Sequence, residues 1–326
     1  MTRAKITGVG SYAPKRILTN ADLEKMIETS DEWIVQRSGI RERRIVDDGE
    51  ATSDLAVRAA QQALERAGLG PEDIDFIVVG TTTPDMFFPS VGNLVQQRLG
   101  CRRVGSVDVL AACAASVYSM TIGAQFIQTG KYRRVLCIGA ETLSRITDWT
   151  DRGTCVLLAD AAGAAVLEPS DDGSGLLDAE LYSDGQYWDL LYMPGGGSRH
   201  PATRETVDAR MHYAKMKGNE VFKVAVRMFV DSTSGLLARH GLAAADVDLF
   251  IPHQANLRII EAAAKRVGLP MERVFVNVDR YGNTGAASVY VALEEAVTGG
   301  RIKRGDLVLL AAFGGGFAWG SALLRW

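Results

Sequence analysis

The chain has 326 residues, of which 47% are hydrophobic and 23% are charged, a composition typical of a globular protein large enough for two cored units. The net charge of −3 provides no overall basic field that would favour a nucleic-acid-binding protein. The four cysteines show neither CxxC nor Cys/His spacing, which argues against a disulfide framework and against a zinc site.

Neither the N-terminal nor the C-terminal segment has a sequence pattern that predicts a membrane span. Charged residues such as Lys5 and Lys15 interrupt the apolar stretch that a signal peptide needs. Residues 307–324 carry no charge and approach the length of a membrane helix, but the triple glycine Gly314–Gly316 costs a helix about 3 kcal/mol relative to alanine. Two buried strands joined by a glycine turn fit this segment better. We therefore expect a cytoplasmic protein without a membrane span.

Buried strands alternate with helices along the chain. Helices are expected at residues 114–128 and 257–267, and residues 185–211, which show no periodicity, are expected to form a long loop. Strands that are apolar at nearly every position are typical of sheets covered by helices on both faces, so the pattern predicts an α/β fold. Such strands are expected at residues 74–79, 107–110, 135–138, 247–251, 274–276 and 307–310.

The sequence also repeats itself. Residues 64–78 read LERAGLGPEDIDFIV, and residues 237–251 read LARHGLAAADVDLFI. The pentapeptide AASVY stands at residues 114–118 and again at 286–290, at nearly the same offset. Two unrelated units of similar composition are the alternative. The matching segments follow one another in the same order in both halves, which favours a duplication. We predict two halves, residues 1–172 with a nucleophilic cysteine and residues 173–326, related by a pseudo-twofold axis.

Cys113 is the candidate nucleophile, because it lies between a predicted strand and a predicted helix. There a thiol faces unpaired N–H groups and the positive end of the helix dipole, which favours the reactive thiolate. A small buried hydrophobic residue is the alternative for any lone cysteine. Cys137 and Cys155 receive that interpretation, and Cys101 receives no role.

His253 and Asn283 occupy loops of the second half. His253 lies at a strand-to-helix corner, where a neutral imidazole that donates a hydrogen bond is expected. Asn283 lies in a glycine-rich loop that precedes AASVY, as the Cys113 loop does. A structural histidine and a simple asparagine turn are the alternatives. Because the repeat pairs these loops, we expect Cys113, His253 and Asn283 to meet near the pseudo-twofold axis.

Residues 314–316 add a third glycine-rich loop, which offers backbone N–H groups to an oxyanion. A phosphate site is the alternative, although the lysine that completes a P-loop is absent from the sequence.

Six segments spread over nearly the whole chain carry the most specific patterns. They are the Cys113 segment and DEWIVQRSGIRERR (31–44), TDRGT (150–154), PHQANLRII (252–260), GNTGAAS (282–288) and AFGGGFAWGSALLRW (312–326). The chain resembles β-ketoacyl-acyl carrier protein synthase III, the initiating condensing enzyme of bacterial fatty-acid synthesis. The resemblance implies the thiolase fold, a five-layered αβαβα core, a homodimer, and a reaction without a metal or redox cofactor. One departure is the run Leu158–Gly163, which replaces a more usual Gly-Asp-Gly.

The resemblance also implies roles for individual residues. Cys113 accepts an acyl group from a short acyl-CoA, expected to be acetyl-CoA, which then condenses with malonyl-carrier protein. His253 and Asn283 bind the malonyl thioester carbonyl during decarboxylation, and the backbone N–H groups of Cys113 and Gly315 form an oxyanion hole. The remaining assignments are coenzyme A binding by Trp33, Arg37, Arg152, Met216, Phe222 and Asn256, carrier-protein binding by Lys223, Arg258, Lys265 and Arg266, and closure of the acyl pocket by Phe88.

Other functions are compatible with parts of this pattern. A condensing enzyme or acyltransferase of polyketide or other secondary metabolism would share the Cys/His/Asn set. A nicotinamide-dependent oxidoreductase would need a GxGxxG between a first strand and its helix, which the sequence lacks. A non-catalytic partner of the carrier protein would not require Cys113, His253 and Asn283 together.

Overall fold

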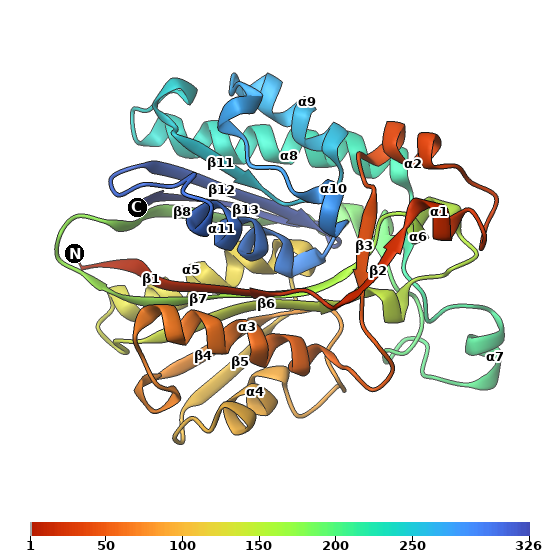
Figure 1. The fold of residues 1–326 in the computed structure, drawn as a ribbon, viewed down its shortest axis with the longest axis horizontal. Coiled ribbons are helices and arrows are strands. Elements are labelled where there is room, and N and C mark those ends of the chain that lie inside the picture. Colours follow the sequence, from red (N-terminus) through yellow and green to blue (C-terminus); the bar gives the residue numbers. More distant parts are fainter. Residues whose placement is uncertain (1) are drawn as a thin grey trace.

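In the computed structural model, which describes residues 2–326, two β-sheets alternate with three layers of helices (Figure 1). This arrangement confirms the predicted five-layered αβαβα core. The outer layers hold α3 (Thr52–Ala67) with α4 (Val91–Leu99) and α8 (Gly218–Arg239) with α9 (Leu257–Val267), and the central layer holds α5 (Ala115–Gln128) and α11 (Ser288–Thr298).

Each sheet combines parallel and antiparallel strands. The first has the order β1 (Arg3–Tyr12), β7 (Asp160–Ser170), β6 (Val135–Thr142), β4 (Phe76–Gly80) and β5 (Gly105–Val109). The second has the order β8 (Gly175–Ser183), β13 (Ala318–Arg325), β12 (Leu307–Gly314) and β11 (Leu249–Pro252). The order of β8, β13, β12 and β11 repeats that of β1, β7, β6 and β4, as a duplication requires. The division of the chain at residue 172 remains a prediction.

The largest apolar cluster lies between the two sheets, around α5 and α11. Both central helices begin at the repeated AASVY, and the hydroxyls of Ser119 and Tyr290 join them at 2.9 Å. Gly139 of β6 allows this packing, because a Cβ at that position would lie 2.1 Å from the carbonyl oxygen of Ala286. The N-terminal ends of both helices are therefore held between the sheets.

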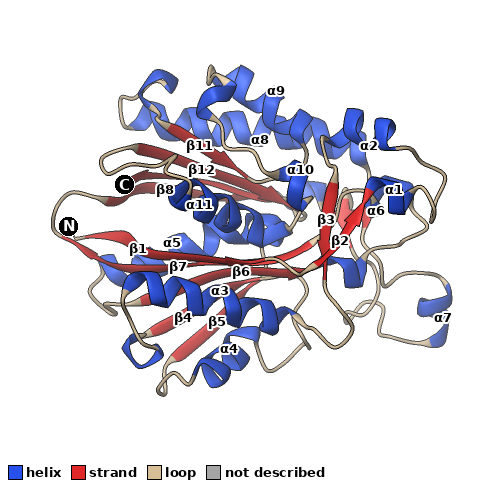
Figure 2. Ribbon diagram, viewed as in Figure 1, coloured by secondary structure: helices blue, strands red, loops and turns tan. Residues whose placement is uncertain are grey.

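The shorter elements gather mostly at one end of the layers (Figure 2). The predicted loop at residues 185–211 is irregular but holds a short strand and a short helix, which its lack of periodicity concealed. These elements are β2 (Arg16–Thr19), α1 (Asn20–Leu23), α2 (Asp31–Ser38), β3 (Glu42–Ile45), α6 (Arg152–Cys155), β9 (Leu191–Tyr192), α7 (Arg204–Asp208), β10 (Lys215–Met216) and α10 (Val278–Tyr281).

Two expectations about strands are wrong. Residues 274–276 form no strand: Val274 makes one isolated bridge to Phe250, and the chain then turns into α10. The strand predicted at residues 107–110 is β5, but it is the outermost strand of its sheet and is not buried on both faces. Val107 is 39% exposed and Leu110 is 79% exposed, so apolar composition alone misled the prediction of burial.

The uncharged segment at residues 307–324 forms β12 and β13, which pair antiparallel across a glycine turn, as expected. Among residues 2–326, no helix is both long enough and apolar enough to cross a membrane.

Candidate active site

Three loops meet where the central helices begin. Cys113 lies in the 3-10 turn η2 (Ala112–Ala114) directly before α5, and Asn283 lies just before η7 (Gly285–Ala287), which leads into α11. The turn η2 contacts both η7 and β12, and Ala114, Ala286 and Ala318 share a buried cluster between them. The structure thus brings together the loops that the repeat paired.

The glycine at the end of β12 permits this approach. A Cβ on Gly314 would lie 2.5 Å from the backbone nitrogen of Cys113 and 2.8 Å from the Cβ of Ala112. Ala112 itself has a φ of +46°, a left-handed conformation that alanine seldom adopts. In the loops and turns of residues 2–326, the N–H groups of Cys113 and Gly315 donate to no backbone carbonyl. Both donors are therefore available for a ligand oxygen.

The environment of the Cys113 thiol differs from the prediction. Cys113 precedes α5 rather than capping it, and burial, together with the nearby Glu141 carboxylate, raises the pKa of the thiol to about 12. In this state burial and the Glu141 carboxylate therefore oppose the thiolate that the position before a helix led us to expect. A protonated thiol fits the site, and its proton has to leave during acyl transfer.

His253 follows β11, and its backbone N–H donates to the carbonyl of Ala311 at 2.7 Å. The side chain is 1% exposed, and the ring meets the ring of Phe313 edge-on with centroids 5.4 Å apart. Burial lowers the pKa of the imidazole to about 3, so the ring is neutral at physiological pH, as expected. Nδ1 lies 2.6 Å from Oγ of Ser288, and Nε2 has no hydrogen-bond partner within residues 2–326.

Asn283 is held by a neighbouring segment of the first half. Its N–H donates to Leu157 at 2.8 Å, and its carbonyl accepts from Ala159 at 2.9 Å. Its side-chain Oδ1 accepts the N–H of Gly285 at 3.0 Å. This bond orients the amide, and the Nδ2 group keeps its hydrogens free of any partner in the described chain.

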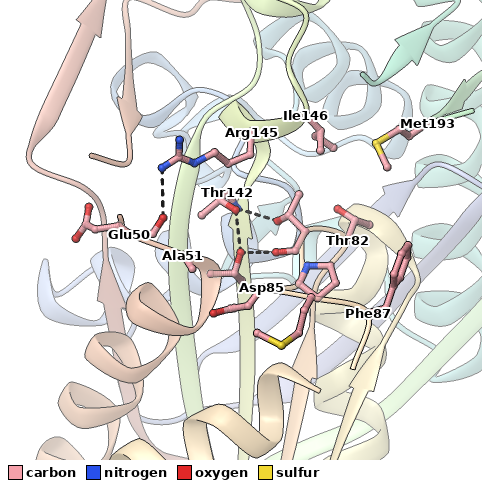
Figure 3. A pocket seen from close by; sticks show the side chains of 13 residues that line it. Glu50, Ala51, Thr82, Asp85, Phe87, Thr142, Arg145, Ile146 and Met193 are labelled. Carbon is pink, nitrogen blue, oxygen red and sulfur yellow. Dashed lines mark hydrogen bonds between the residues drawn. The ribbon is translucent and has the colours of Figure 1, made fainter. Parts of the chain in front are cut away.

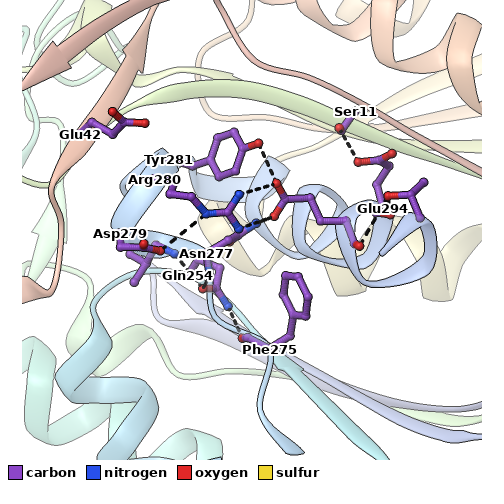
Figure 4. Close-up of polar contacts among 12 residues, drawn as sticks. Ser11, Glu42, Gln254, Phe275, Asn277, Asp279, Arg280, Tyr281 and Glu294 are labelled. Carbon is purple, nitrogen blue, oxygen red and sulfur yellow. Dashed lines mark hydrogen bonds and ion pairs between the residues drawn. The ribbon is translucent and has the colours of Figure 1, made fainter. Parts of the chain in front are cut away.

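A polar network ties the His253 and Asn283 loops to α11 (Figure 4). The buried side-chain oxygen of Gln254 accepts the N–H groups of Asn277 and Val278 at 2.9 and 3.2 Å. Glu295 of α11 accepts from Asn277 at 2.9 Å and from the Tyr281 hydroxyl at 2.8 Å. None of these residues was predicted as a site residue, although Gln254 lies inside the PHQAN pattern.

Glu141 was also missed. It is fully buried in β6 and accepts hydrogen bonds from the hydroxyls of Thr82 at 3.0 Å and Thr83 at 2.6 Å. Burial raises the pKa of this carboxyl to about 7 in spite of these donors. A single acidic residue in the otherwise apolar run VLCIGAET was the signal that could have revealed it.

The residues expected to bind coenzyme A lie largely on one surface. The guanidinium of Arg152 lies 4.6 Å from the centroid of the Trp33 ring, and that of Arg37 lies 5.6 Å from it. Asn256 caps α9, and its side chain donates to the carbonyl of Arg37 at 3.0 Å. Met216 lies on β10, which contacts the helix that carries Arg152.

Three of the four residues expected to bind the carrier protein lie on α9, the helix that Asn256 caps. The Arg258 guanidinium lies 5.6 Å from the ring of Phe222, which joins α9 to α8 beside Lys223. Lys223, Arg258, Lys265 and Arg266 are all exposed. Lys265 and Arg266 lie in the last turn of α9, where positive charge also favours the helix dipole.

A cavity of about 460 Å³ lies beside the segment that follows β4 (Figure 3). Thr82, Thr142 and Met193 line it together with Phe87. Phe87 is 82% exposed and Phe88 is 84% exposed in the single chain, so neither ring packs in the chain's own core.

Within residues 2–326 all four cysteines are free, and no cluster of three or more histidine, cysteine or acidic side chains could hold a metal ion.

The fold and the converging loops define a condensing acyltransferase of the thiolase-fold class. The 3-oxoacyl-[acyl-carrier-protein] synthase III from Aquifex aeolicus superposes with a TM-score of 0.93 at 46% identity, covering 99% of this chain and 100% of the other. Family models of 3-oxoacyl-[acyl-carrier-protein] synthase III and of its C-terminal part match residues 107–185 and 237–326. The curated β-ketoacyl-[acyl-carrier-protein] synthase III of Caldanaerobacter subterraneus subsp. tengcongensis is 53% identical over 99% of this chain and 98% of its own length. The chain belongs to this synthase III family.

A solved relative comes from another kind of pathway. The priming β-ketosynthase of the R1128 polyketide biosynthetic pathway is 34% identical, with a TM-score of 0.91 over 98% of this chain and 96% of its own.

Proposed function

We propose that this enzyme condenses acetyl-CoA with malonyl-acyl carrier protein through an acyl-cysteine and so initiates fatty-acid synthesis in the cytoplasm. The observation that carries the proposal is a pair of neutral side chains, His253 and Asn283, each with a nitrogen that has no protein partner in the described chain. Asn283 precedes η7, which contacts the Cys113 turn η2, and His253 contacts Ser288 of α11, the helix into which η7 leads. Neutral donors suit an enolate oxygen, because they stabilise its charge without having to carry one themselves.

The first half-reaction transfers the acyl group. The sulfur of Cys113 attacks the carbonyl carbon of acetyl-CoA, and the bond from that carbon to the coenzyme A sulfur breaks. The proton of Cys113 ends on the departing coenzyme A thiol. The unengaged N–H groups of Cys113 and Gly315 support this step, since they can hold the oxyanion of the tetrahedral intermediate.

The second half-reaction forms the carbon–carbon bond. The malonyl thioester loses CO₂, and the electron pair of the broken bond forms an enolate whose oxygen accepts from His253 and Asn283. The enolate carbon then attacks the acyl-Cys113 carbonyl, the bond from that carbon to the Cys113 sulfur breaks, and the new β-ketoacyl thioester forms. Cys113 leaves as a thiolate, which takes up one proton from solvent to restore the thiol. No redox change occurs in either half-reaction, so the reaction needs neither an oxidant nor a reductant.

The direct test is intact-mass analysis after mixing the protein with a panel of acyl-CoAs, followed by malonyl-carrier protein. A mass gain that tracks acyl length, and its loss on adding malonyl-carrier protein with release of a β-ketoacyl product, supports the proposal. A stable acyl-enzyme without condensation would indicate simple acyl transfer instead.

Priming of a polyketide pathway is the second candidate, favoured by the polyketide relative described above. Comparison of carrier proteins from the two kinds of pathway as malonyl donors separates the candidates. A strong preference for a polyketide carrier would favour the second.

We infer that coenzyme A lies along Trp33, Arg37, Arg152 and Asn256. The guanidinium of Arg152 lies over the Trp33 ring. The adenine base would separate these two planar groups and lie between them, an arrangement that suits both aromatic stacking and the cation–π attraction. Met216 and Phe222 would supply apolar contact along the same surface, since both lie at the edge of the apolar cluster around α8 and α9.

The acidic carrier protein would dock on the exposed basic face of α8 and α9. Arg258→Glu is expected to raise the KM for malonyl-carrier protein roughly tenfold while acyl-CoA kinetics stay nearly unchanged. The effect should shrink at high salt, because exposed charges are screened beyond about 8–10 Å at physiological ionic strength. Steady-state kinetics with each substrate at two salt concentrations measure both expectations.

Lys303→Glu is the matched control, because this exposed lysine on the loop before β12 has the same charge and lies outside the proposed face. Equal losses with both substrates in the Arg258 variant would instead point to damage at the active site.

We propose that the chain acts as a homodimer. The edge strand β5 carries the exposed side chain of Val107, and the exposed Leu110 follows it directly. β5 pairs with β4, and the segment after β4 holds the exposed Phe87 and Phe88. An unpaired edge with exposed apolar residues suits association with a second copy. In such a dimer Phe88 would reach the acyl pocket of the partner subunit.

Phe88 is therefore expected to limit primer length. Forcing extra methylenes against a packed wall costs about 1–3 kcal/mol, which corresponds to roughly tenfold or more in kcat/KM. Acetyl-CoA should be preferred by the wild-type enzyme, and Phe88→Ala should shift preference toward octanoyl-CoA by at least about tenfold. The ratio of kcat/KM for the two primers is the measurement.

Phe87→Ala is the control, because this neighbour is equally exposed and equally apolar. Wild-type preference for octanoyl-CoA, or equal shifts in the two variants, would show that Phe88 is not the wall.

A further inference from the structure

Ser288, the first residue of α11, touches the ring of His253. It is 1% exposed, and its Oγ lies 2.6 Å from Nδ1 of His253 and 3.3 Å from the backbone nitrogen of Gln254. The shorter contact is typical of a strong hydrogen bond, and the longer one brings the N–H of Gln254 to the same hydroxyl oxygen.

Counting donors and acceptors determines which partner supplies the hydrogen. The Gln254 N–H can only donate, so Ser288 Oγ accepts from it. The Ser288 hydroxyl hydrogen then has one acceptor in reach among residues 2–326, which is Nδ1 of His253. If Nδ1 carried the proton instead, the hydroxyl hydrogen would be buried without an acceptor, a costly arrangement in the interior.

Serine and threonine hydroxyls in a helix commonly donate to the backbone carbonyl three or four residues earlier. Thr298, at the other end of α11, donates to the carbonyl of Glu294 four residues earlier at 2.9 Å. Ser288 makes no such bond to its own backbone within the described chain. Its hydroxyl is directed at the imidazole, and the neutral ring must therefore carry its single proton on Nε2, the nitrogen without a protein partner.

We propose that Ser288 is a positioning residue that holds His253 in the Nε2–H tautomer, with that N–H directed to the substrate oxygen. This inference deepens the proposed function and rests on it, since a proton on Nδ1 would leave Nε2 an acceptor, unable to stabilise an enolate. Through the Gln254 N–H, the same hydroxyl also fixes the loop that carries His253 against the start of α11.

The tautomer can be observed directly by ¹⁵N–¹H correlation of the imidazole in the full-length enzyme. The chain has four histidines, and the signals of His253 are assigned by their loss in His253→Ala. We expect a protonated Nε2 and an unprotonated Nδ1 in the wild type. Ser288→Ala should shift these signals toward a mixture of tautomers, and Ser288→Thr, which keeps the hydroxyl, should restore them.

The kinetic counterpart is a split between half-reactions. Ser288→Ala should slow malonyl decarboxylation roughly tenfold, the size of one lost buried hydrogen bond, and leave acylation of Cys113 within about twofold. Ser116→Ala is the matched control for the tautomer. Ser116 occupies the same place in the first AASVY and bonds the carbonyl of Cys113 at 3.3 Å, not His253.

Each outcome is decisive for the inference. A wild-type His253 with its proton on Nδ1, or His253 signals that Ser288→Ala leaves unchanged, would overturn it, and the wild-type spectrum decides even if Ser288→Ala fails to fold. Absence of decarboxylation by the wild-type enzyme would instead overturn the proposed function, and the tautomer measurement would remain valid.

Discussion

Cys113→Ser is expected to abolish formation of the acyl-enzyme and to reduce condensation by at least about a thousandfold. The pKa of the Cys113 thiol is already raised to about 12 by burial and by Glu141. A serine hydroxyl is a far weaker acid than a thiol, so the same surroundings leave it protonated and unreactive. Intact-mass analysis after incubation with acetyl-CoA measures the acyl-enzyme, and product analysis measures condensation.

Cys137→Ser is the control for this experiment. Cys137 is fully buried in β6, and its sulfur lies 3.4 Å from the carbonyl of Ser119, an acceptor that a serine hydroxyl can also use. This variant should retain most of the activity. An acyl group found on the Cys113→Ser protein would place the nucleophile elsewhere.

The fold could be predicted largely because it is a duplication. Gly68, the C-cap of α3, and Gly241, which follows the C-cap of α8, correspond in the repeat and both have a positive φ, at +68° and +65°. The two AASVY segments both begin a central helix. Each local pattern alone predicts little, but its repetition predicts that both halves form the same strands and helices in the same order.

Burial was harder to predict than secondary structure. The strand β5 reads as a core strand, yet it lies at the edge of the sheet, because strand order depends on contacts between distant segments. Residues 274–276 are apolar but form no strand. The side chain of Gln254 donates to the carbonyl of Phe275 at 3.1 Å and accepts the N–H of Asn277 at 2.9 Å, so these backbone groups are not free to pair with a strand. Hydrogen bonds from Gln254, a residue distant in the sequence, thus take the place of the backbone hydrogen bonds expected between strands.

The protonation states of the site residues also could not be predicted from the sequence. The position of Cys113 before a helix suggested a thiolate, but the pKa depends on burial and on Glu141, which lies on another strand. Ser288 was visible as part of GNTGAAS, yet its contact with His253 follows from the packing of α11 against the end of β11. Local motifs identify the reacting groups, and tertiary contacts determine their protonation.

His253→Ala and Asn283→Ala are expected to impair malonyl decarboxylation much more than acylation of Cys113. Removing one positioned donor to a developing oxyanion typically costs about 10²–10³ in rate. Neither side chain is assigned to activation of the thiol, so acylation should fall by less than about tenfold. Release of labelled CO₂ measures decarboxylation, and rapid-quench mass analysis measures acylation.

His240→Ala is the control, because His240 is partly exposed and pairs with Asp178 at 3.0 Å, away from the active-site loops. Normal decarboxylation in both active-site variants would contradict the enolate-binding role.

The pH dependence tests the charge of His253 independently. Burial lowers the pKa of this imidazole from 6.5 to about 3, so the neutral donor persists as the pH falls and protonation begins only below about pH 4. Decarboxylation by the wild-type enzyme should therefore show no loss between pH 8 and pH 5 that depends on His253. A loss near pH 7 that persists in His253→Ala would belong to Glu141, because burial raises the pKa of that carboxyl to about 7. A loss in this pH range that disappears in His253→Ala would mean that the imidazole titrates in the working enzyme, and a permanently neutral donor would then be the wrong description of its role.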